Sequence, residues 1–540
     1  MASGRGVTFH HPGAFWAGTA AVTAGVLLHL PMYLDARDMH YRLVGMPVDG
    51  PMKVGMALVL GGLIASFYGL LPPRGRPVRD AARLRVRALD DARLSRAHVG
   101  LLLVMAVAVT IDVMKPVTLS FVAPGMGKEY GLKSALNPHG RVPVAYLPLA
   151  GITGTVLGSF LWGWLGDRIG RRASILLAGV LFVGTSICGS MPDYRWNFAM
   201  CFVMGLGVGG MLPITFALMA EAIPARHRGW LMVLIGGDVA GAYIITSWLS
   251  ARLVPTYSWR ILWLLGLPTG LLLILLNRWI PESPRFLVQN GRDAEARDVM
   301  ARYGATMVEE GDSELDVERD IRSGWGQLLV GPFGGLSVVV GLFGVAVGLV
   351  TFGFQLWIPT NLQRLGFSEV TSSTVLRDSA ILGFPATFLI AALYGFWSSK
   401  KTMILLALVT AASLLGFVAL GDRVAQNSLR LHLLLVLPIT GISSILAVLV
   451  AYASETYPTR VRSRGTGLAA GASKLGGVVI IALVVAGATA PSIARTALIG
   501  AVPLVLGAVA MGVFGIETRH RRLEEITAEE LAGVGAKAGG

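Results

Sequence analysis

Charged residues are scarce in this sequence. Asp, Glu, Lys and Arg make up 14% of its 540 residues, whereas hydrophobic residues make up 54%, and the mean hydropathy is +0.64. So little charge excludes a disordered chain and an ordinary water-soluble domain. The composition is typical of a protein that has lipid as its main solvent.

Cysteines and catalytic motifs are also nearly missing. The two cysteines, Cys188 and Cys201, lie in apolar runs without a C-x-x-C motif, so neither a disulfide framework nor a zinc site is indicated. The nine histidines show no metal-ligand spacing. Because no Walker A, G-x-S-x-G or H-E-x-x-H motif occurs, the sequence indicates neither ATP-driven chemistry nor hydrolysis. We therefore expect no enzyme, no cofactor and no metal.

A single nucleotide-binding pattern occurs, and its context argues against that function. Gly205, Gly207 and Gly210 fit G-x-G-x-x-G, but they lie in a long apolar run that no strand precedes. We interpret these glycines as positions where two helices pack closely.

Long apolar runs are abundant. Fourteen of them can cross a hydrocarbon core about 30 Å thick. If the N-terminus is cytoplasmic, most of the 46 Lys and Arg residues fall in cytoplasmic loops and tails, as the positive-inside rule requires. This distribution explains the net charge of +14 without nucleic acid, and we interpret the Arg-rich segment 72–98 as a membrane-surface connector. The runs lie near 14–34, 53–72, 98–122, 144–164, 173–191, 196–220, 229–251, 260–280, 334–358, 375–397, 402–420, 431–454, 466–487 and 496–516.

The sequence repeats itself within its last twelve spans. Residues 220–230 (AEAIPARHRGW) and 454–465 (SETYPTRVRSRG) share E-x-x-P-x-R-x-R at an offset of 234, and 121–132 and 356–367 share Pro and Gly at an offset of 235. Because the two offsets are nearly equal, the last twelve spans are predicted to form two repeated halves of six helices each. We divide the chain into two additional N-terminal helices (1–72), a basic cytoplasmic connector (73–97), an N-terminal bundle (98–280), a linker with short helices (281–333), a C-terminal bundle (334–516) and a cytoplasmic tail (517–540).

Four motifs occur in the order and spacing of a known family. They are GWLGDRIGRR (163–172), GLGVGGMLP followed by AEAIPARHRG (205–229), PESPRFL (281–287) and IETRHRRLEEI (516–526). With them, residues 97–528 resemble the major facilitator superfamily. The resemblance implies an all-α membrane protein of two six-helix bundles, here with two extra N-terminal helices. It also implies transport by alternating access around a site at the membrane midplane.

Charges in the cytoplasmic loops are candidates for a gate. Short loops with charges of both signs can form ion pairs that hold two bundles together and break when the bundles rock apart. By resemblance, Asp167 is expected at the N-terminal end of the eleventh repeat helix, where the helix dipole favours a carboxylate. The alternative is that the arginines act only as topology signals. The gate residues that we predict are Asp167, Arg168, Arg171, Arg172, Glu221, Arg228, Glu455, Arg460 and Arg462.

Ionisable residues inside the spans are few, and they usually face a cavity or a partner. Asp112 and Lys115 are three residues apart, so they share one helical face and can form a pair. A carboxylate at membrane depth beside a cation can carry a proton, which makes Asp112 our first candidate; a static structural pair is the alternative. For Arg377 and Asp378, the alternative to a proton or solute contact is that their side chains snorkel to the outer membrane interface. The further candidates for proton or substrate contacts are Asp238, Lys474, Arg377 and Asp378.

The resemblance supports Asp112 and also shows a departure. The first helix of proton-coupled sugar and organic-acid porters commonly carries an aspartate at this place. In the fourth repeat helix, however, Cys201 in CFVMGLG stands where those families have an arginine. We hypothesise that Lys115 supplies the missing positive charge.

The seventh repeat helix points to a substrate class. Residues 352–367 (FGFQLWIPTNLQRLGF) are similar to the W-x-P-x-x-L-x-x-x-G-F pattern of aromatic-acid and niacin-type porters. Lys474 in GASKLGG stands where those porters have an arginine, and a cation there would attract a carboxylate. Aromatic side chains that could stack on a ring, with core packing as the alternative, are Tyr243, Phe354 and Trp357.

The function predicted from these patterns is secondary transport of a small organic anion or metabolite across the cytoplasmic membrane, with proton coupling as a hypothesis. The expected partners are the solute, protons and the lipid bilayer, and both termini are expected in the cytoplasm. Two alternatives stay open. One is a proton-driven exporter of hydrophobic compounds, and the other is a non-transporting sensor that uses the two extra helices for docking.

Overall fold

Helices dominate the computed structural model, which describes residues 9–71, 84–85, 93–304, 308–309, 328, 333–457, 459–487 and 492–518. Fourteen helices in this part of the chain are long and apolar enough to cross a membrane, which confirms the predicted spans. Most of the predicted connector, part of the linker and the tail beyond Thr518 lie outside the described residues.

The chain forms two compact units. The division runs through helices α9 (Val239–Tyr257) and α17 (Glu369–Ala392), which contribute residues to both. The first unit consists of Met1–Arg226, Ile245–Glu310 and Glu369–Thr374, and the second of His227–Ile244, Gly311–Ser368 and Val375–Gly540.

Among the described residues, the first unit contains eleven further α-helices and one short ladder. In the ladder, β1 (Leu84–Arg85) pairs antiparallel with β2 (Val308–Glu309), with Leu84 opposite Glu309. The α-helices are α1 (Pro12–Leu27), α2 (Leu30–Asp35), α3 (Gly50–Leu70), α4 (Arg96–Glu129), α5 (Tyr146–Ile169), α6 (Arg171–Thr185), α7 (Tyr194–Ala222), α10 (Arg260–Leu264), α11 (Gly266–Leu276), α12 (Pro284–Gln289) and α13 (Asp293–Arg302). Short 3-10 helices are η1 (Ala36–Met39), η4 (Ser186–Ser190) and η5 (Asn277–Trp279).

The second unit contains most of α8 (Ala225–Gly237) and a continuous run of helices from α15 onward. Two of its segments, η8 (Leu393–Trp397) and η10 (Leu437–Gly441), are π-helical. The others are α15 (Phe333–Gly353), η7 (Gln355–Trp357), α16 (Ile358–Arg364), α18 (Ser399–Leu420), η9 (Gly421–Gln426), α19 (Ser428–Val436), α20 (Ile442–Thr456), α21 (Thr459–Gly487) and α22 (Ile493–Phe514).

Glycines let helices approach closely in both units. A Cβ atom on Gly205 of α7 would lie 2.0 Å from the Gly151 carbonyl oxygen of α5, and one on Gly210 would lie 1.9 Å from the Trp162 ring. These contacts confirm the packing interpretation of the glycine motif. In the second unit, α15 and α21 approach in the same way, because a Cβ atom on Gly348 would lie 1.9 Å from a backbone oxygen of α21.

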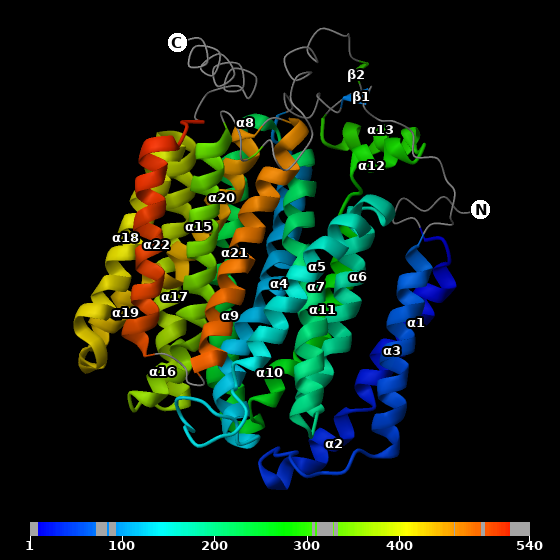
Figure 1. Ribbon diagram of the computed structural model, residues 1–540. Coiled ribbons are helices and arrows are strands. Elements are labelled where there is room, and N and C mark those ends of the chain that lie inside the picture. Colours follow the sequence, from blue (N-terminus) through cyan, green and yellow to red (C-terminus); the bar gives the residue numbers. More distant parts are fainter. Residues whose placement is uncertain are drawn as a thin grey trace. The chain divides into compact units, whose positions relative to one another are not determined.

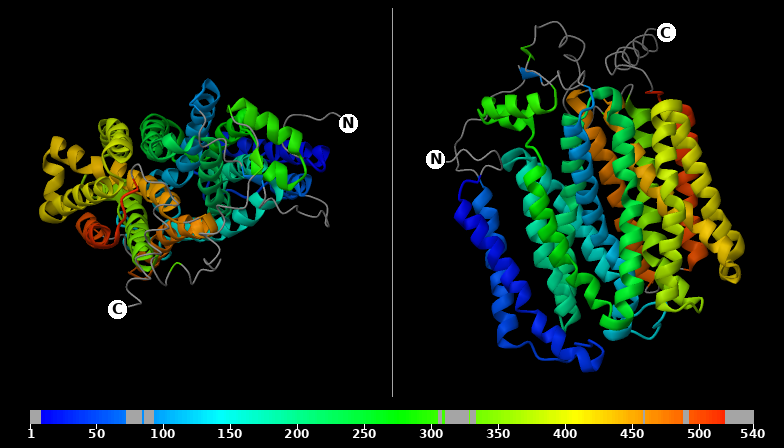
Figure 2. Two further views of the ribbon diagram at one scale, coloured as in Figure 1. Left: turned by 90° about the horizontal axis from the view of Figure 1, so that it is seen from above. Right: turned by 180° about the vertical axis from the view of Figure 1, so that it is seen from behind.

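Helices α1 and α3 form a hairpin that covers α6 (Figures 1 and 2). Within the hairpin, Gly18 faces Gly62 and Gly25 faces Gly55, each with room for a hydrogen atom only. Against α6, the space beside Gly184 is filled by hairpin valines and leucine. As a result, 94% of the apolar window in the span Arg171–Ser190 is buried, against 44% in the span Ser399–Gln426 that contains α18.

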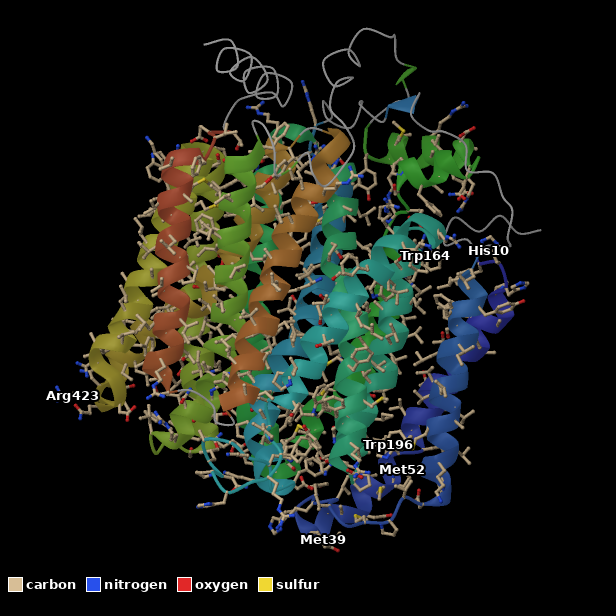
Figure 3. All side chains as sticks on the ribbon, viewed as in Figure 1. His10, Met39, Met52, Trp164, Trp196 and Arg423 are labelled. Carbon is tan, nitrogen blue, oxygen red and sulfur yellow. The ribbon has the colours of Figure 1, made fainter. Side chains whose placement is uncertain are left out.

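Hydrogen bonds fasten the hairpin at one end. The Leu43 backbone N–H donates to Glu129 Oε1 at 2.9 Å, and Arg260 Nη2 donates to the same oxygen at 2.8 Å. The Tyr33 hydroxyl donates to the Tyr257 carbonyl oxygen at 2.6 Å. Figure 3 shows Met39, Met52 and Trp196 at this end, while His10 and Trp164 lie at the opposite end.

Candidate functional site

The predicted pair Asp112 and Lys115 lies on α4, a helix that continues through Pro116 and Pro124. Asp112 has no exposed surface, and Lys115 is 6% exposed. The two side chains interact electrostatically, as their spacing of three residues predicted. A desolvated pair of opposite charges is thus built into the first unit.

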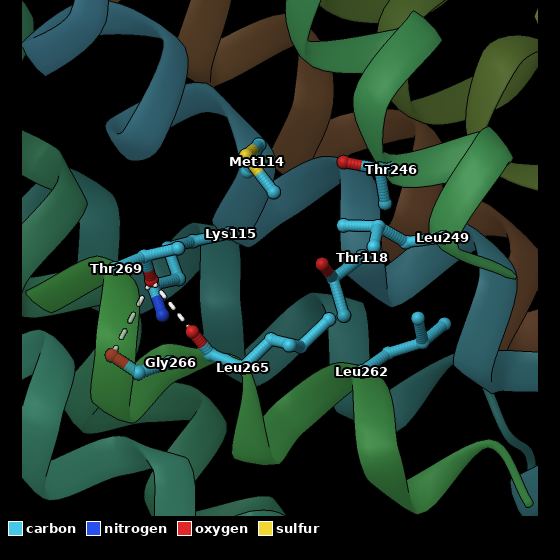
Figure 4. Close-up of a pocket in the computed structure, with 9 residues that line it drawn as sticks. All are labelled: Met114, Lys115, Thr118, Thr246, Leu249, Leu262, Leu265, Gly266 and Thr269. Atoms are coloured by element: carbon cyan, nitrogen blue, oxygen red, sulfur yellow. Dashed lines mark hydrogen bonds between the residues drawn. The ribbon is translucent and has the colours of Figure 1, made fainter. Parts of the chain in front are cut away.

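The Lys115 ammonium lies inside the first unit, among α6, η4 and α11. Its Nζ atom is 5.4 Å from the centroid of the Phe182 ring, which is a cation–π distance. A Cβ atom at Gly266 would lie 2.7 Å from Nζ, so only glycine leaves the ammonium in this place. Figure 4 shows Lys115 reaching toward Gly266 and Thr269 of α11.

Cys201, at the position where an arginine was expected, is fully buried in α7. Cys188 of η4 is fully buried as well, so both thiols are shielded from water. Lys115 lies on another helix, α4, and the hypothesis that it supplies the missing positive charge stays a prediction.

Asp238 marks a break between α8 and α9 in the second unit. The Asp238 backbone N–H donates to the Ile235 oxygen at 3.2 Å, and the Ala242 N–H donates to the Asp238 oxygen at 3.3 Å. Helix thus continues on either side of the break. Tyr243, just beyond it, is buried. The sequence predicted one uninterrupted span over 229–251, because hydrophobic periodicity does not record such a break.

Phe354 and Trp357 are buried at the end of α15 and in η7. The Phe354 ring packs edge-on against Phe417 of α18, with the ring centroids 5.2 Å apart. Trp357 begins a polar face that continues with Thr360 and Asn361 of α16. Trp357 Nε1, Thr360 Oγ1 and Asn361 Oδ1 are buried and accept or donate no hydrogen bond within the described ranges. We did not single out Thr360 and Asn361 from the sequence, although their i+3 and i+4 spacing from Trp357 was a usable signal.

Three charged candidates lie on α17 and α21 in the second unit. Arg377 and Asp378 pair with each other, with Nη2 2.7 Å from Oδ1, and are 29% and 41% exposed. Mutual pairing at a half-exposed position makes both weak candidates for a solute contact. Lys474 is half-buried on α21. It is a cation within an apolar span, as the sequence indicated.

The arginines around the start of α6 have contacts within the first unit. Arg171 donates from Nη1 to a backbone oxygen of α5 at 2.9 Å, and Arg172 donates from Nε to the Asn277 carbonyl oxygen at 3.0 Å. The Arg168 guanidinium stacks 4.5 Å from the centroid of the Trp164 ring. The predicted gate side chains outside the described part of the chain are those of Asp167, Glu221, Arg460 and Arg462.

Two carboxylates that we did not select bind the first turns of α6 and α18. Glu282 Oε1 accepts hydrogen bonds from the backbone N–H groups of Arg171 at 2.8 Å and Arg172 at 3.3 Å. Glu517 Oε1 accepts from the Ser399 N–H at 3.0 Å and from its hydroxyl at 2.7 Å. Helix N-termini favour such anions. The available signal was the repeat, because Glu282 and Glu517 are 235 residues apart.

Glu455 is the centre of a polar cluster in the second unit. Its Oε2 accepts hydrogen bonds from the Tyr394 hydroxyl at 2.6 Å and from Thr518 Oγ1 at 2.8 Å. The predicted gate residue Arg228 interacts with Glu455 electrostatically. Tyr394 and Thr518 are 61 and 63 residues from Glu455, so no local sequence pattern indicated them.

These features define a multi-pass helical membrane protein with ionisable groups buried inside its spans. Residues 99–481 match the family described as the Major Facilitator Superfamily, and the chain belongs to this superfamily. The match begins at residue 99, so the α1–α3 hairpin lies outside it. The chain is therefore a membrane transporter of this class that carries an additional helical hairpin.

Similar proteins include named transporters. The niacin transporter NiaP of Acinetobacter baylyi is 24% identical over 397 residues, which cover 73% of this chain and 88% of NiaP. The 4-hydroxybenzoate transporter PcaK of the same organism is 26% identical over 410 residues, covering 72% and 85%. Among solved structures, the proton:xylose symporter XylE of E. coli has a TM-score of 0.64 at 20% identity, covering 80% of this chain and 98% of that chain. The likeness to XylE shows the fold.

Proposed function

We propose that this protein moves a small organic anion across the cytoplasmic membrane by alternating access, driven by the proton gradient, with both termini in the cytoplasm. The observation that carries the proposal is the buried pair of Asp112 and Lys115 on α4. A carboxylate that is shielded from water and lies beside an ammonium can exist with or without a proton, because each state is stabilised by a different factor. Asp112 is therefore the proton carrier in this proposal.

An aromatic carboxylate is the solute class that we favour. The relatives NiaP and PcaK are named for niacin and 4-hydroxybenzoate, which are both aromatic acids. Lys474 provides a half-buried cation for the carboxylate. Trp357 and Thr360 provide buried groups with hydrogen-bonding capacity to spare. A few such polar groups in an otherwise apolar surrounding are what fixes a small ligand.

The polar cluster around Glu455 is proposed as one half of the cytoplasmic gate. Tyr394 and Thr518 hold the Glu455 carboxylate, and Arg228 adds a compensating charge. A gate of this kind works only if its contacts exist in one state and break in the other. Glu455→Gln should therefore change the rate of solute exchange more than the affinity for the solute.

The test is uptake of labelled aromatic and aliphatic carboxylates into proteoliposomes, with and without an imposed pH gradient. Wild type should accumulate an aromatic acid only with the gradient. Asp112→Asn should lose accumulation by at least tenfold, yet retain exchange of labelled for unlabelled solute, because the neutral side chain no longer carries a proton but leaves the solute site in place.

Glu295→Gln, on the exposed surface of α13, is the matched control for loss of one carboxylate and should transport like wild type. Accumulation by Asp112→Asn equal to that of wild type would refute the role of Asp112. Flux that ignores the gradient would refute proton coupling. Absence of flux for every carboxylate, with the protein folded, would refute the solute class and favour an exporter or a sensor.

A further inference from the structure

A small cavity lies beside Lys115, wholly within the first unit. Helices α4, α9, α10 and α11 line it, and its polar lining consists of Lys115, Thr118, Thr246 and Thr269. Figure 4 shows these side chains around the cavity. Trp357 and Lys474 do not line this cavity and belong to the second unit.

The polar groups of this cavity have unused hydrogen-bonding capacity. Within the described part of the chain, the Lys115 ammonium makes no hydrogen bond and no hydrogen-bonded ion pair. Thr246 Oγ1 is buried without a partner, and Thr118 Oγ1 makes no hydrogen bond to a described residue either. Only Thr269 is satisfied, through the Leu265 carbonyl oxygen at 2.8 Å. A buried ammonium and two buried hydroxyls left in this condition would cost several kcal/mol, so a ligand that accepts hydrogen bonds is expected.

Size and charge restrict that ligand. The cavity volume is about 10 Å³, which is room for about one water-sized particle and excludes an acid that carries a ring. Lys115 contributes a full positive charge and three donors, and the two threonines contribute hydroxyl donors. We propose that the cavity binds a single small inorganic anion of halide size, held by the Lys115 ammonium with the hydroxyls of Thr118 and Thr246 as further donors.

Asp112 competes with this anion for the same positive charge. It lies one helical turn from Lys115 and interacts with it electrostatically. Removal of the Asp112 charge should therefore strengthen anion binding. Substitutions of these two neighbouring residues should therefore have opposite effects on anion affinity. Asp112→Asn should tighten anion binding, and Lys115→Met should abolish it.

The test is thermal unfolding of the purified full-length protein in detergent, with chloride replaced stepwise by isethionate at constant ionic strength. Isethionate is too large for the cavity and carries no carboxylate. A ligand that binds only the folded state raises the melting temperature in a saturable manner. We expect a rise of roughly 2 to 4 °C in wild type, a larger rise in Asp112→Asn, a reduced one in Thr118→Val and Thr246→Val, and none in Lys115→Met.

Two variants separate this site from general salt effects. Thr215→Val removes a buried hydroxyl of α7 that does not line the cavity, and Lys401→Met removes an exposed cation of α18. Both should keep the full chloride-dependent rise. If Lys115→Met does not fold, the two threonine variants decide. A rise of equal size in the cavity and control variants, or no saturable rise in wild type, would show that the cavity holds water only and would overturn the proposal without affecting the proposed transport function.

Discussion

Arg260 shows how a buried charged side chain is stabilised by its neighbours. The side chain has no exposed surface, and its guanidinium meets Glu129, the carbonyl oxygens of Met191 and Gly189, and the Trp259 ring. Removing one partner from such a pair leaves the other charge buried without compensation. Glu129→Gln should therefore destabilise the protein by about 3 kcal/mol. The measurement is the melting temperature of the purified protein.

The surface pair of Arg292 and Glu295 is the comparison for this prediction. Its side chains are 20% and 39% exposed, although Nη2 and Oε2 are only 2.6 Å apart. Water screens such a pair, so Glu295→Gln should cost no more than about 1 kcal/mol. Equal losses in the two variants would mean that burial is not the source of the effect.

Glu282 should make stability depend on pH. Burial is the largest influence on this group and raises the pKa of its carboxyl, against the opposing effect of the backbone N–H groups of Ser283, Arg172 and Arg171. All three N–H groups bond to Oε1, so Oε2 can carry a proton without losing them. A folded-state pKa above the unfolded value gives a contribution that is complete below the unfolded pKa and is lost as pH rises through the folded pKa.

Glu282→Gln resembles the protonated carboxyl, because it keeps an acceptor at Oε1 and carries no charge. The melting temperatures of wild type and Glu282→Gln should coincide near pH 4 and diverge as the pH rises, with the glutamine variant the more stable. The opposite order at neutral pH would show that the ionised carboxylate is the stabilising form at the start of α6.

Sequence reasoning at this scale reached only partners that are local in the chain. Asp112 and Lys115 are three residues apart in a helix, and their interaction follows from helical geometry. Glu282 and Tyr394 were missed because their partners are 111 and 61 residues away, and such contacts depend on how whole helices pack. The cavity beside Lys115 was missed for the same reason, since it needs threonines from three helices.

At the scale of helices, the contact between α5 and α7 depends on glycine. A Cβ atom on Gly205 would lie 2.0 Å from the Gly151 carbonyl oxygen, and backbone cannot move aside as a side chain can. Gly205→Ala should therefore lower the melting temperature through separation of the two helices. Gly100→Ala in α4 meets nothing within 4 Å, and it should leave the melting temperature unchanged or raise it slightly because alanine favours helix. Similar values for both variants would contradict the packing argument.

The existence of the helices was predictable, but some of their interior features were not. Fourteen apolar runs of sufficient length gave the spans, because lipid requires complete internal hydrogen bonding. The break at Asp238 and the π-helical turn Leu437–Gly441 could not be predicted from the hydrophobic pattern, because both lie inside continuous apolar runs. The Nε2 atom of Gln355 in η7 donates to two carbonyl oxygens of that turn, those of Pro438 and of Ile439, the latter at 3.3 Å. This contact depends on how the two helices pack, so the sequence could not reveal it.

At the scale of the whole molecule, the hairpin of α1 and α3 is an addition to a superfamily fold that begins at residue 99. Deletion of residues 1–72 should leave a chain that still folds and transports, because the matched region stays intact. Its melting temperature should fall by several degrees, since α6 loses its cover and Glu129 loses the Leu43 N–H. Circular dichroism and the uptake assay would measure both properties.

Tyr33→Phe in the full-length chain tests the same attachment of the hairpin with a smaller change than the deletion. It removes only the hydroxyl that donates to the Tyr257 carbonyl oxygen, so a loss of about 1 kcal/mol is expected. A truncated chain as stable as wild type would show that the hairpin adds nothing to the fold. A truncated chain that never folds would make the hairpin part of the core.

The hairpin also has a place in the order of synthesis. Helices α1 and α3 leave the ribosome long before Tyr257, which follows roughly 10 to 40 s later at about 5 to 20 residues per second. Glu129, which accepts from the Leu43 N–H, follows α3 after roughly 3 to 12 s at the same rate. Until then neither Tyr33 nor Leu43 has its acceptor, and the hairpin is held by its own contacts, Gly18 with Gly62 and Gly25 with Gly55. These four glycines therefore determine whether the hairpin keeps its shape until the later helices arrive.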